Sequence, residues 1–441
     1  MPDEPQKASE LKYTQLAKLQ RLLSALVPGN RFWTEKIAAA KVQPADVRSL
    51  DDLQKLPFTT KAELVADQER HPPYGSNLTY EVSRYTRLHQ TSGTTGAPLR
   101  WLDTAESWSW IHDCWRQLFD LMGLVPSDRL FFPFSFGPFL GFWAGFEGAS
   151  QRGNFCLAGG GLSSQARLQL LIENEITVVC CTPTYALRLA EVATEQRIDL
   201  ATSRVRAILV AGEPGGNVPA TRERIEDAWG ARVVDHWGMT ELGPLAIEAV
   251  DSPGTLTVLE TECIAEIVDP TTLAPVPAGS EGELVITNLG RAGSPLIRYR
   301  TGDVVRAAPS PPTSLPRGER GEGHSFLRLD GGILGRVDEL VTIRGNNVYP
   351  TALENVVRQF DAVAEFRITL HSSATAQRLR VEIEPTPQAV STAQVDRTLS
   401  SIARAIRDQW HLHAEVEAVA SGSLPRFEMK GRRFVKISEQ A

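Results

Sequence analysis

Cysteine is scarce in this chain of 441 residues, which contains five. The number is odd, and no two cysteines stand in a C-x-x-C pair, so the sequence excludes a small fold held together by disulfides. We interpret Cys114, Cys156, Cys180, Cys181 and Cys263 as reduced thiols of a cytoplasmic protein. Most of them are expected to fill the core.

An excess of positive charge is also missing. The chain has 46 lysines and arginines against 53 aspartates and glutamates, which gives a net charge of −7. No basic stripe is therefore available to follow a nucleic-acid backbone, and we expect no nucleic-acid partner.

Long apolar runs are absent as well. The longest uncharged stretch, residues 130–146, is interrupted by prolines and glycines and is too short for a membrane span. The first ten residues are polar and acidic and do not predict an export signal. We therefore expect a cytoplasmic protein that does not contact a membrane. The aromatic residues of the 130–146 stretch fit either the wall of a ligand pocket or plain core, and both interpretations stay open.

What is present is an alternation of helical and β-branched segments between residues 165 and 237. Apolar spacing predicts helices at 166–175 and 184–196, and short runs predict strands at 177–182, 205–210 and 232–236. This order is typical of a parallel sheet, in which ligands bind beyond the carboxyl ends of the strands. The loops that follow the last two strands, AGEP and WGMTE, are the first candidates for a site.

The pattern changes after residue 256. Short strands separated by turns predict antiparallel pairing as far as residue 305, and residues 309–323 are rich in Pro, Gly, Ser and Arg. A compact α+β unit with helices near 352–359 and 392–408 follows. We place a domain boundary between an N-terminal domain, residues 1–335, and a C-terminal domain, residues 336–441.

A run of small and hydroxylated residues, HQTSGTTGAP, occupies positions 89–98. Its glycines let backbone N–H groups turn inward and its hydroxyls add donors, so it could wrap a phosphate chain. It lacks the Gly-Lys-Ser/Thr ending of a Walker A loop. Taken alone, such a run is more often a solvated turn.

Other short motifs accompany it in a defined order. They are SLDDLQKLPFTTK (49–61), TSGTTG (91–96), TPTYAL (182–187), GEP (212–214), WGMTE (237–241), RYRTGD (298–303), GRVD (335–338), RGNNVYP (344–350) and LPRFEMK (424–430). This series resembles the adenylate-forming superfamily of acyl-CoA synthetases, and most closely its phenylacetate-CoA ligase branch. The resemblance covers nearly the whole chain. It implies an α/β fold with a large N-terminal domain of parallel-sheet layers plus a small β-barrel, followed by a small α+β C-terminal lid domain.

The resemblance also implies a reaction. In this family a carboxylic acid attacks the α-phosphate of ATP to give an acyl-adenylate, and a thiol then displaces AMP. It points to an ATP-dependent aryl-CoA ligase for an aromatic acid, while aliphatic acids and a carrier-protein acceptor stay open. A catalytically silent nucleotide- or acyl-binding protein is the alternative from another class, and the presence of both Glu241 and Lys430 argues against it. A homodimer is kept open.

Site residues follow from the same resemblance. Phosphates are assigned to Thr91, Ser92, Gly93, Thr94, Thr95 and Gly96. The nucleotide is assigned to Gly212, Glu213, Pro214, Asp235, His236, Trp237, Gly238, Asp303 and Arg336, with Asp303 at the ribose. Thr240 and Lys430 are expected at the α-phosphate, Glu241 at Mg²⁺, and Asp338 at the hinge. The acyl pocket is assigned to Phe136, Phe139, Gly141, His236 and Gly238.

Three departures from the family pattern stand out. Ala97 replaces a common lysine after the phosphate loop, residues 309–323 replace a cysteine cluster, and His236 replaces an isoleucine of the branch. A buried imidazole needs a hydrogen-bond partner, and an amino or hydroxyl group on the substrate could supply it. We therefore expect an aminobenzoate such as anthranilate, or a hydroxybenzoate, ahead of phenylacetate. The alternative is that His236 bonds a neighbouring backbone group.

Overall fold

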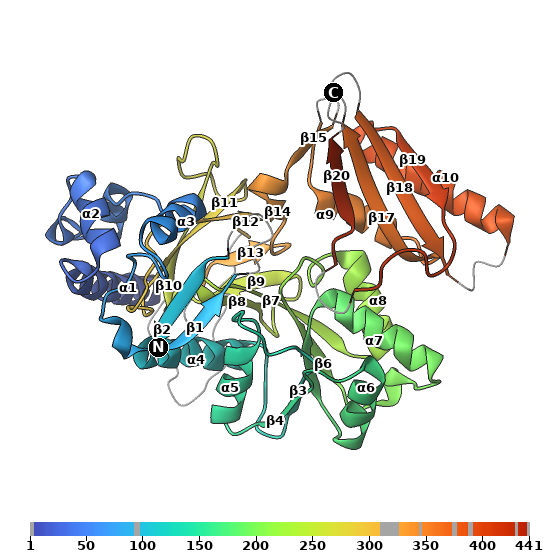
Figure 1. Cartoon of the computed structure of the whole chain (residues 1–441), viewed down its shortest axis with the longest axis horizontal. Helices are drawn as coiled ribbons and strands as arrows, with labels where there is room; N and C mark the ends of the chain where they lie inside the picture. Colours follow the sequence, from blue (N-terminus) through green and yellow to red (C-terminus); the bar gives the residue numbers. More distant parts are fainter. Residues whose placement is uncertain are drawn as a thin grey trace.

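The computed structural model describes residues 4–91, 98–308, 326–343, 346–372, 377–386, 391–427 and 431–438. Figure 1 shows a large body, coloured blue to light orange, and a smaller body, coloured darker orange to red, above one side of it. Within the described residues, no helix is both long enough and apolar enough to cross a membrane.

An eight-stranded sheet lies at the centre of the described part of the large body, in the order β13-β9-β8-β7-β6-β5-β3-β4. The five strands from β7 to β4 are parallel, and β8, β9 and β13 continue the sheet antiparallel. Their bounds are β3 Arg129–Phe132, β4 Phe155–Ala158, β5 Val178–Cys181, β6 Ala207–Val210, β7 Arg232–Met239, β8 Gly243–Glu248, β9 Thr255–Val258 and β13 Arg328–Asp330. The predicted parallel sheet is confirmed.

Helices cover both faces of this sheet. Alternate residues of a strand point to opposite faces, and they enter two separate cores. Val179 and Ile208 pack with α6, α7 and α8, whereas Cys180 and Leu209 pack with α4 and α5. The helices are α4 Ala105–Leu121, α5 Trp143–Gln151, α6 Ser164–Glu173, α7 Pro183–Glu195 and α8 Pro219–Trp229. All four residues of β5 and of β6 are buried, as expected for strands covered on both faces.

The segment expected to form a small barrel holds a sheet of four described antiparallel strands in the order β10-β11-β12-β14. These strands are β10 Cys263–Val268, β11 Glu281–Asn288, β12 Tyr299–Arg306 and β14 Gly335–Arg336. The N-terminal part adds a two-stranded sheet and three helices, which are β1 Tyr85–Gln90, β2 Arg100–Thr104, α1 Glu4–Leu26, α2 Arg31–Ala39 and α3 Lys61–Arg70. Short 3-10 helices are η1 Pro44–Asp46, η2 Leu50–Lys55, η3 Val82–Arg84, η4 Leu200–Thr202 and η5 Val337–Glu339.

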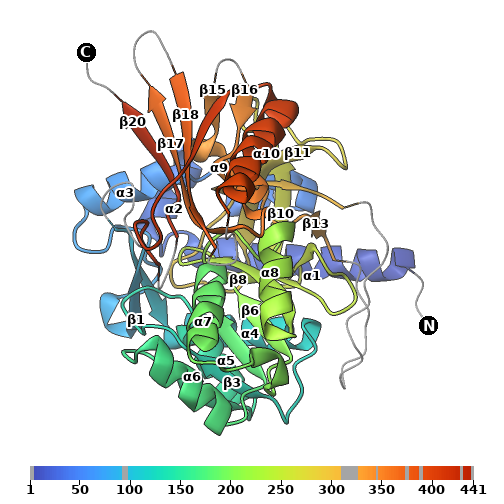
Figure 2. The ribbon, with the colours of Figure 1, turned by 90° about the vertical axis from the view of Figure 1, so that its right-hand side faces the viewer.

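The smaller body has its own hydrophobic core and is the α+β unit that the sequence predicted. Its described strands pair in the order β19-β18-β17-β20, beside a short β15-β16 hairpin. The elements are β15 Val341–Ile343, β16 Asn346–Val348, α9 Pro350–Arg358, β17 Val363–Ser372, β18 Gln377–Pro385, α10 Thr392–Trp410, β19 Ala414–Ala418 and β20 Phe434–Ser438. Both views place this body above α7 and α8, and α8 contacts α9 (Figure 1, Figure 2).

The exact boundary between the bodies stays a prediction. Arg336 still pairs with Asp303 across β14 and β12, so it belongs to a sheet of the large body. Val341 already enters the core of the small body. The connection therefore passes from one body to the other over the few residues between them.

Candidate active site

Three predicted motifs meet at one edge of the central sheet. TPTYAL follows β5, GEP follows β6, and WGMTE begins within β7. Because β5, β6 and β7 are parallel neighbours, their carboxyl ends share this edge. Thr182 caps α7 there by accepting a hydrogen bond from the Tyr185 N–H, so the loop after β5 turns at once into a helix.

Trp237, Asp303 and Arg336 come together although they are far apart in the sequence. The Trp237 Nε1 donates to Asp303 Oδ2 at 2.8 Å, and the Arg336 Nη1 donates to Asp303 Oδ1 at 3.0 Å. Burial raises the pKa of the Asp303 carboxyl to about 6, although the Arg336 charge and both hydrogen bonds lower it. Gly302 has φ +76°, and a Cβ there would lie 2.9 Å from Arg336 Nη2, so this turn requires glycine.

Asp235, two residues before Trp237 in β7, lies beside the loop after β6. Its Oδ2 accepts a 2.6 Å hydrogen bond from the Nδ2 of Asn217, a residue that the sequence analysis missed. Burial and the neighbouring Glu248 carboxylate raise the pKa of Asp235 to about 7. Gly216 approaches this carboxylate so closely that a Cβ would lie 2.2 Å from Oδ1. The structure thus joins the predicted Asp235 to the predicted GEP loop.

Glu213, in that GEP loop, uses both carboxylate oxygens on backbone amides. Oε1 accepts from the Thr184 N–H at 2.8 Å, and Oε2 accepts from the Gly431 N–H at 2.6 Å. Its neighbours Gly212 and Pro214 are exposed at the same edge. The loop therefore contacts the start of α7 and the C-terminal body.

Thr240 and Glu241 lie in the turn between β7 and β8. A completely buried Arg291 donates to the Thr240 carbonyl oxygen at 2.6 Å and forms two hydrogen bonds with Asp103, at 2.7 and 2.6 Å. Asp103 and Arg291 were missed by the sequence analysis, because a pair 188 positions apart leaves no local signal. They fix the turn that carries the predicted Glu241.

Glu241 is 3% exposed. Among the described residues, no group of three or more His, Cys, Asp or Glu is arranged to hold a metal. Mg²⁺ commonly binds one or two carboxylates and takes the rest of its ligands from substrate phosphates and water. A single carboxylate at this position fits that mode of binding.

A chain of ring contacts runs from the 130–146 stretch to His236. Phe134 contacts Phe136, Phe139 and Phe142 with ring centroids 5.2 to 5.7 Å apart, and Trp115 links Phe142 to His236. Phe134, Phe136 and Phe139 are half-buried. Gly141 is exposed with φ +39°, and a Cβ there would lie 2.2 Å from the Phe134 ring. Of the predicted acyl-site residues, Phe136, Phe139 and His236 therefore belong to one partly accessible aromatic cluster, and Gly141 lies against it.

His236 hydrogen-bonds a backbone group through one ring nitrogen. Its Nδ1 lies 2.8 Å from the carbonyl oxygen of Ala246, so Nδ1 carries the proton. Burial lowers the pKa of His236 to about 4, which keeps the ring neutral at pH 7. For Nδ1, the structure therefore shows the alternative in which His236 bonds a neighbouring backbone group. The neutral ring has a lone pair at Nε2, which can accept a further hydrogen bond. Gly238, two residues further along β7, is exposed, and a Cβ there would lie 2.8 Å from the Gly243 carbonyl oxygen.

Several predicted residues do not enter this geometry. Ser92, Gly93, Thr94, Thr95, Gly96 and Lys430 lie outside the described residues, as does Ala97. Thr91 is described, and its Oγ1 accepts a 3.0 Å hydrogen bond from the Leu99 N–H. Asp338 lies in η5, where its Oδ1 accepts a 3.0 Å hydrogen bond from Arg336 Nε.

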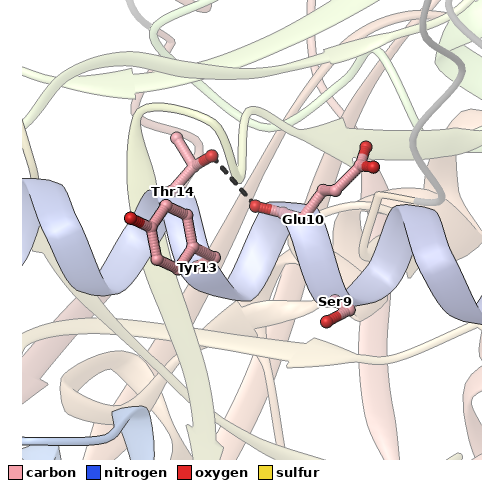
Figure 3. A pocket seen from close by; sticks show the side chains of 4 residues that line it. All are labelled: Ser9, Glu10, Tyr13 and Thr14. Atoms are coloured by element: carbon pink, nitrogen blue, oxygen red, sulfur yellow. Dashed lines mark hydrogen bonds between the residues drawn. The ribbon is translucent and has the colours of Figure 1, made fainter.

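One surface hollow lies away from all of these residues. It lies on α1, and Ser9, Glu10, Tyr13 and Thr14 line it (Figure 3). The Thr14 hydroxyl donates to the Glu10 carbonyl oxygen at 2.9 Å, and Tyr13 is 76% exposed. Because all four residues come from one helix, we regard it as the outer face of α1 and not as part of the site.

The fold and the shared strand edge define a class of protein. The model of the AMP-binding enzyme family matches residues 46–292, and that of the AMP-binding enzyme C-terminal domain matches residues 345–436. The chain belongs to the AMP-binding enzyme family. It is an AMP-forming acid–thiol ligase with the activity of an acyl-CoA ligase.

Named relatives agree with this class. The phenylacetate-coenzyme A ligase of Pseudomonas putida is 28% identical over 435 residues, which are 97% of this chain and 94% of the relative. A solved 2-hydroxyisobutyryl-CoA ligase in the postadenylation state superimposes with a TM-score of 0.90 at 27% identity, covering 98% of this chain and 91% of that one. In its thioesterification state the TM-score is 0.71, at 28% identity over the same shares of both chains. The arrangement of the two bodies here is therefore more similar to the postadenylation state.

Proposed function

We propose that this chain is an aryl-CoA ligase for an aromatic acid that carries a hydrogen-bond donor, an aminobenzoate such as anthranilate or a hydroxybenzoate. The observation that supports this substrate class most directly is His236, whose neutral ring has its Nδ1 proton committed to Ala246 and an acceptor at Nε2. The half-buried phenylalanines linked to it through Phe142 and Trp115 supply flat apolar contacts for a ring.

A hydroxylated aliphatic acid is the second candidate. It is supported by the likeness to the 2-hydroxyisobutyryl-CoA ligase. Its hydroxyl would also donate to Nε2, but it would leave the aromatic cluster without a ring to contact. An unsubstituted phenylacetate, suggested by the Pseudomonas putida relative, would use the ring contacts and leave Nε2 without a donor.

In the proposed nucleotide site, Asp303 lies beside Arg336 and accepts hydrogen bonds from the ribose hydroxyls. Trp237 presents its ring to adenine. A carboxylate has about four lone-pair sites, so the two hydrogen bonds already made to Asp303 leave capacity for a diol. Asp235 and the Gly212–Glu213–Pro214 loop border the same edge. Residues 91–96 hold the β- and γ-phosphates, and Thr240 lies at the α-phosphate.

In the first step, a substrate carboxylate oxygen attacks the α-phosphorus, and the bond to pyrophosphate breaks. Lys430 bridges the carboxylate and the α-phosphate, because a cation there stabilises the charge of the five-coordinate transition state. Glu241 would hold Mg²⁺, which neutralises charge on the triphosphate when it is bound.

In the second step, a thiol attacks the carbonyl carbon of the adenylate and AMP leaves. For this step the part of the C-terminal domain that follows Asp338 rotates about this residue as a lid and removes Lys430 from the site, while Arg336 stays in the sheet of the large body. The thiol is that of coenzyme A. A carrier-protein phosphopantetheine is chemically equivalent and is the second acceptor to test. We place the enzyme in the cytoplasm and propose a homodimer as an assembly to test.

The test is a screen of carboxylic acids for pyrophosphate release with ATP and Mg²⁺, followed by addition of coenzyme A. We expect 2-aminobenzoate or a hydroxybenzoate to give the highest kcat/KM, with AMP and an aryl-CoA as products. A preference for phenylacetate or for 2-hydroxyisobutyrate would contradict the substrate class. Pyrophosphate release that does not depend on an added acid would contradict the proposed ligase reaction itself.

A further inference from the structure

Glu213 joins the two bodies of the protein through one carboxylate. Its Oε1 accepts from the Thr184 N–H, in the first turn of α7, where helix amides have no partner within the helix. Its Oε2 accepts from the Gly431 N–H, which belongs to the C-terminal body. Both contacts are charge-assisted hydrogen bonds, of 2.8 and 2.6 Å.

A second contact between the bodies lies beside the first. The Arg433 Nη1 donates to the Thr184 Oγ1 at 3.2 Å, while Nε and Nη2 of the same guanidinium bind both oxygens of Glu365 at 2.6 and 2.9 Å. Gly431 fits tightly between these groups, since a Cβ there would lie 2.1 Å from Arg433 Nη1 and 3.0 Å from the Thr184 hydroxyl. Residues 431–433 are thus docked against the start of α7.

These contacts depend on the orientation of the C-terminal body. Thr184 and Glu213 belong to the large body, whereas Gly431 and Arg433 belong to the small one, so a rotation of the small body breaks the bonds between them. A group that binds one orientation of the C-terminal body better than another increases the fraction of molecules in that orientation. The residue that Glu213 holds, Gly431, directly follows Lys430 in the sequence.

We propose that Glu213 is a positioning residue for the adenylation step, because it fixes Gly431, the residue that directly follows the proposed catalytic Lys430. This inference rests on the proposed role of Lys430. It assigns Glu213 to the two backbone amides and not to the nucleotide. The carboxylate is released when the C-terminal domain rotates, and it has no part in thioester formation.

The test compares Glu213→Gln with Glu191→Gln. Glutamine keeps the size of the side chain but can accept on only one side, and its NH2 group then faces one of the two N–H donors. Glu191 lies on α7 and pairs with Arg188, so its substitution removes a carboxylate from the same helix without touching Gly431. We expect Glu213→Gln to slow acid-dependent pyrophosphate release by about tenfold to a hundredfold, the range for a lost hydrogen bond to a charged group. Glu191→Gln should stay within twofold.

Two further readouts separate positioning from other roles. With presupplied acyl-adenylate and coenzyme A, Glu213→Gln should form thioester at the wild-type rate. Its KM for ATP should be unchanged while kcat falls. A raised KM for ATP at wild-type kcat would assign Glu213 to the nucleotide, and equal loss of both half-reactions would make it a folding residue. Either result would overturn the inference.

Hydrogen–deuterium exchange gives an answer that needs no turnover. In the free enzyme, a peptide spanning residues 431–438 should exchange faster in Glu213→Gln than in wild type, while a peptide from the interior of α10 should not change. Equal exchange of the first peptide would overturn the inference. Because this measurement uses no substrate, it separates a failure of the inference from a failure of the proposed function.

Discussion

The indole N–H of Trp237 donates a 2.8 Å hydrogen bond to the carboxylate of Asp303, 66 positions further along the chain. Trp237 lies in β7 of the central sheet and Asp303 lies in β12 of the next sheet, so this bond ties the two sheets together at the proposed nucleotide site. A residue proposed to contact adenine thereby fixes the orientation of the residue proposed to contact ribose.

The first prediction concerns the pH dependence of ATP binding. Burial raises the pKa of Asp303 to about 6, so the carboxylate gains a proton as the pH falls through that value. The wild-type KM for ATP should therefore rise as the pH is lowered from 8 to 5. At pH 8, Asp303→Asn should have a KM for ATP at least about tenfold higher than wild type, because it loses charge-assisted acceptors. Its KM should also show no inflection near pH 6. Initial rates of pyrophosphate release over that pH range measure both effects.

The raised pKa of Asp303 also predicts how the stability of the protein changes with pH. A carboxyl group whose pKa rises from 3.8 to about 6 on folding binds protons more tightly in the folded state. Its contribution therefore favours folding below pH 4 and is lost as the pH rises through 6. Asp303→Asn should be more stable relative to wild type at pH 7 than at pH 4, as measured by thermal unfolding. A constant difference across this range would contradict the buried, shifted carboxyl.

A second prediction concerns His236. In His236→Ile the acceptor at Nε2 is lost while an apolar surface remains, so the preference for acids that carry a donor should fall by about tenfold, the effect of one hydrogen bond. The measurement is kcat/KM for benzoate, 2-aminobenzoate and 2-hydroxybenzoate in both enzymes. An unchanged ranking of the three acids would mean that His236 serves only its bond to Ala246.

The third prediction separates two lysines. Lys430→Ala should lower the rate of adenylate formation by about a hundredfold or more, because a charge that stabilises the transition state is removed. Thioester formation from presupplied acyl-adenylate should be retained. Lys436, exposed on β20, provides the matched control, and Lys436→Ala should leave both rates unchanged. Equal loss of both half-reactions in Lys430→Ala would contradict the assignment.

The fourth prediction concerns the connection between the bodies. Asp338→Pro fixes φ and should slow thioester formation by about tenfold, equivalent to about 1.4 kcal/mol in the barrier, with adenylation nearly intact. Asp338→Ala removes the pair with Arg336 but leaves the backbone free, so it should form thioester nearly as fast as wild type. Single-turnover rates of each half-reaction decide between a hinge and a simple turn.

The sequence predicted the strands that carry the site, because β5, β6 and β7 are short β-branched runs with a turn after each. It did not predict α5, which begins within the 130–146 stretch that prolines and glycines interrupt. Gly145 and Gly148 of α5 pack against Trp115, where a Cβ would lie 3.2 and 3.0 Å from its side chain, so tertiary packing outweighs the low helix propensity of glycine.

The site residues also divide into those that the sequence predicted and those that it did not. Asp303 and Trp237 were predicted because each lies in a recognisable motif. Asn217, Asp103 and Arg291 were not, since their partners are distant in the sequence and each acts by holding another residue. The two amide partners of Glu213 exist only once α7 begins at Pro183 and the C-terminal body is docked, so no linear pattern contains them.

Arg336 pairs with Asp303 through one part of its guanidinium and with Asp338 through another. The proposed rotation at Asp338 would therefore disturb a contact of Arg336, the residue that pairs with the proposed ribose ligand Asp303. If the Asp303–Arg336 pair is stronger in one orientation of the C-terminal domain than in another, thermodynamic linkage requires that this orientation is stabilised by the same free energy. If the C-terminal domain rotates about Asp338 as proposed, departure of AMP and return of this domain would be coupled events, and the enzyme would reset its own orientation at the end of each cycle.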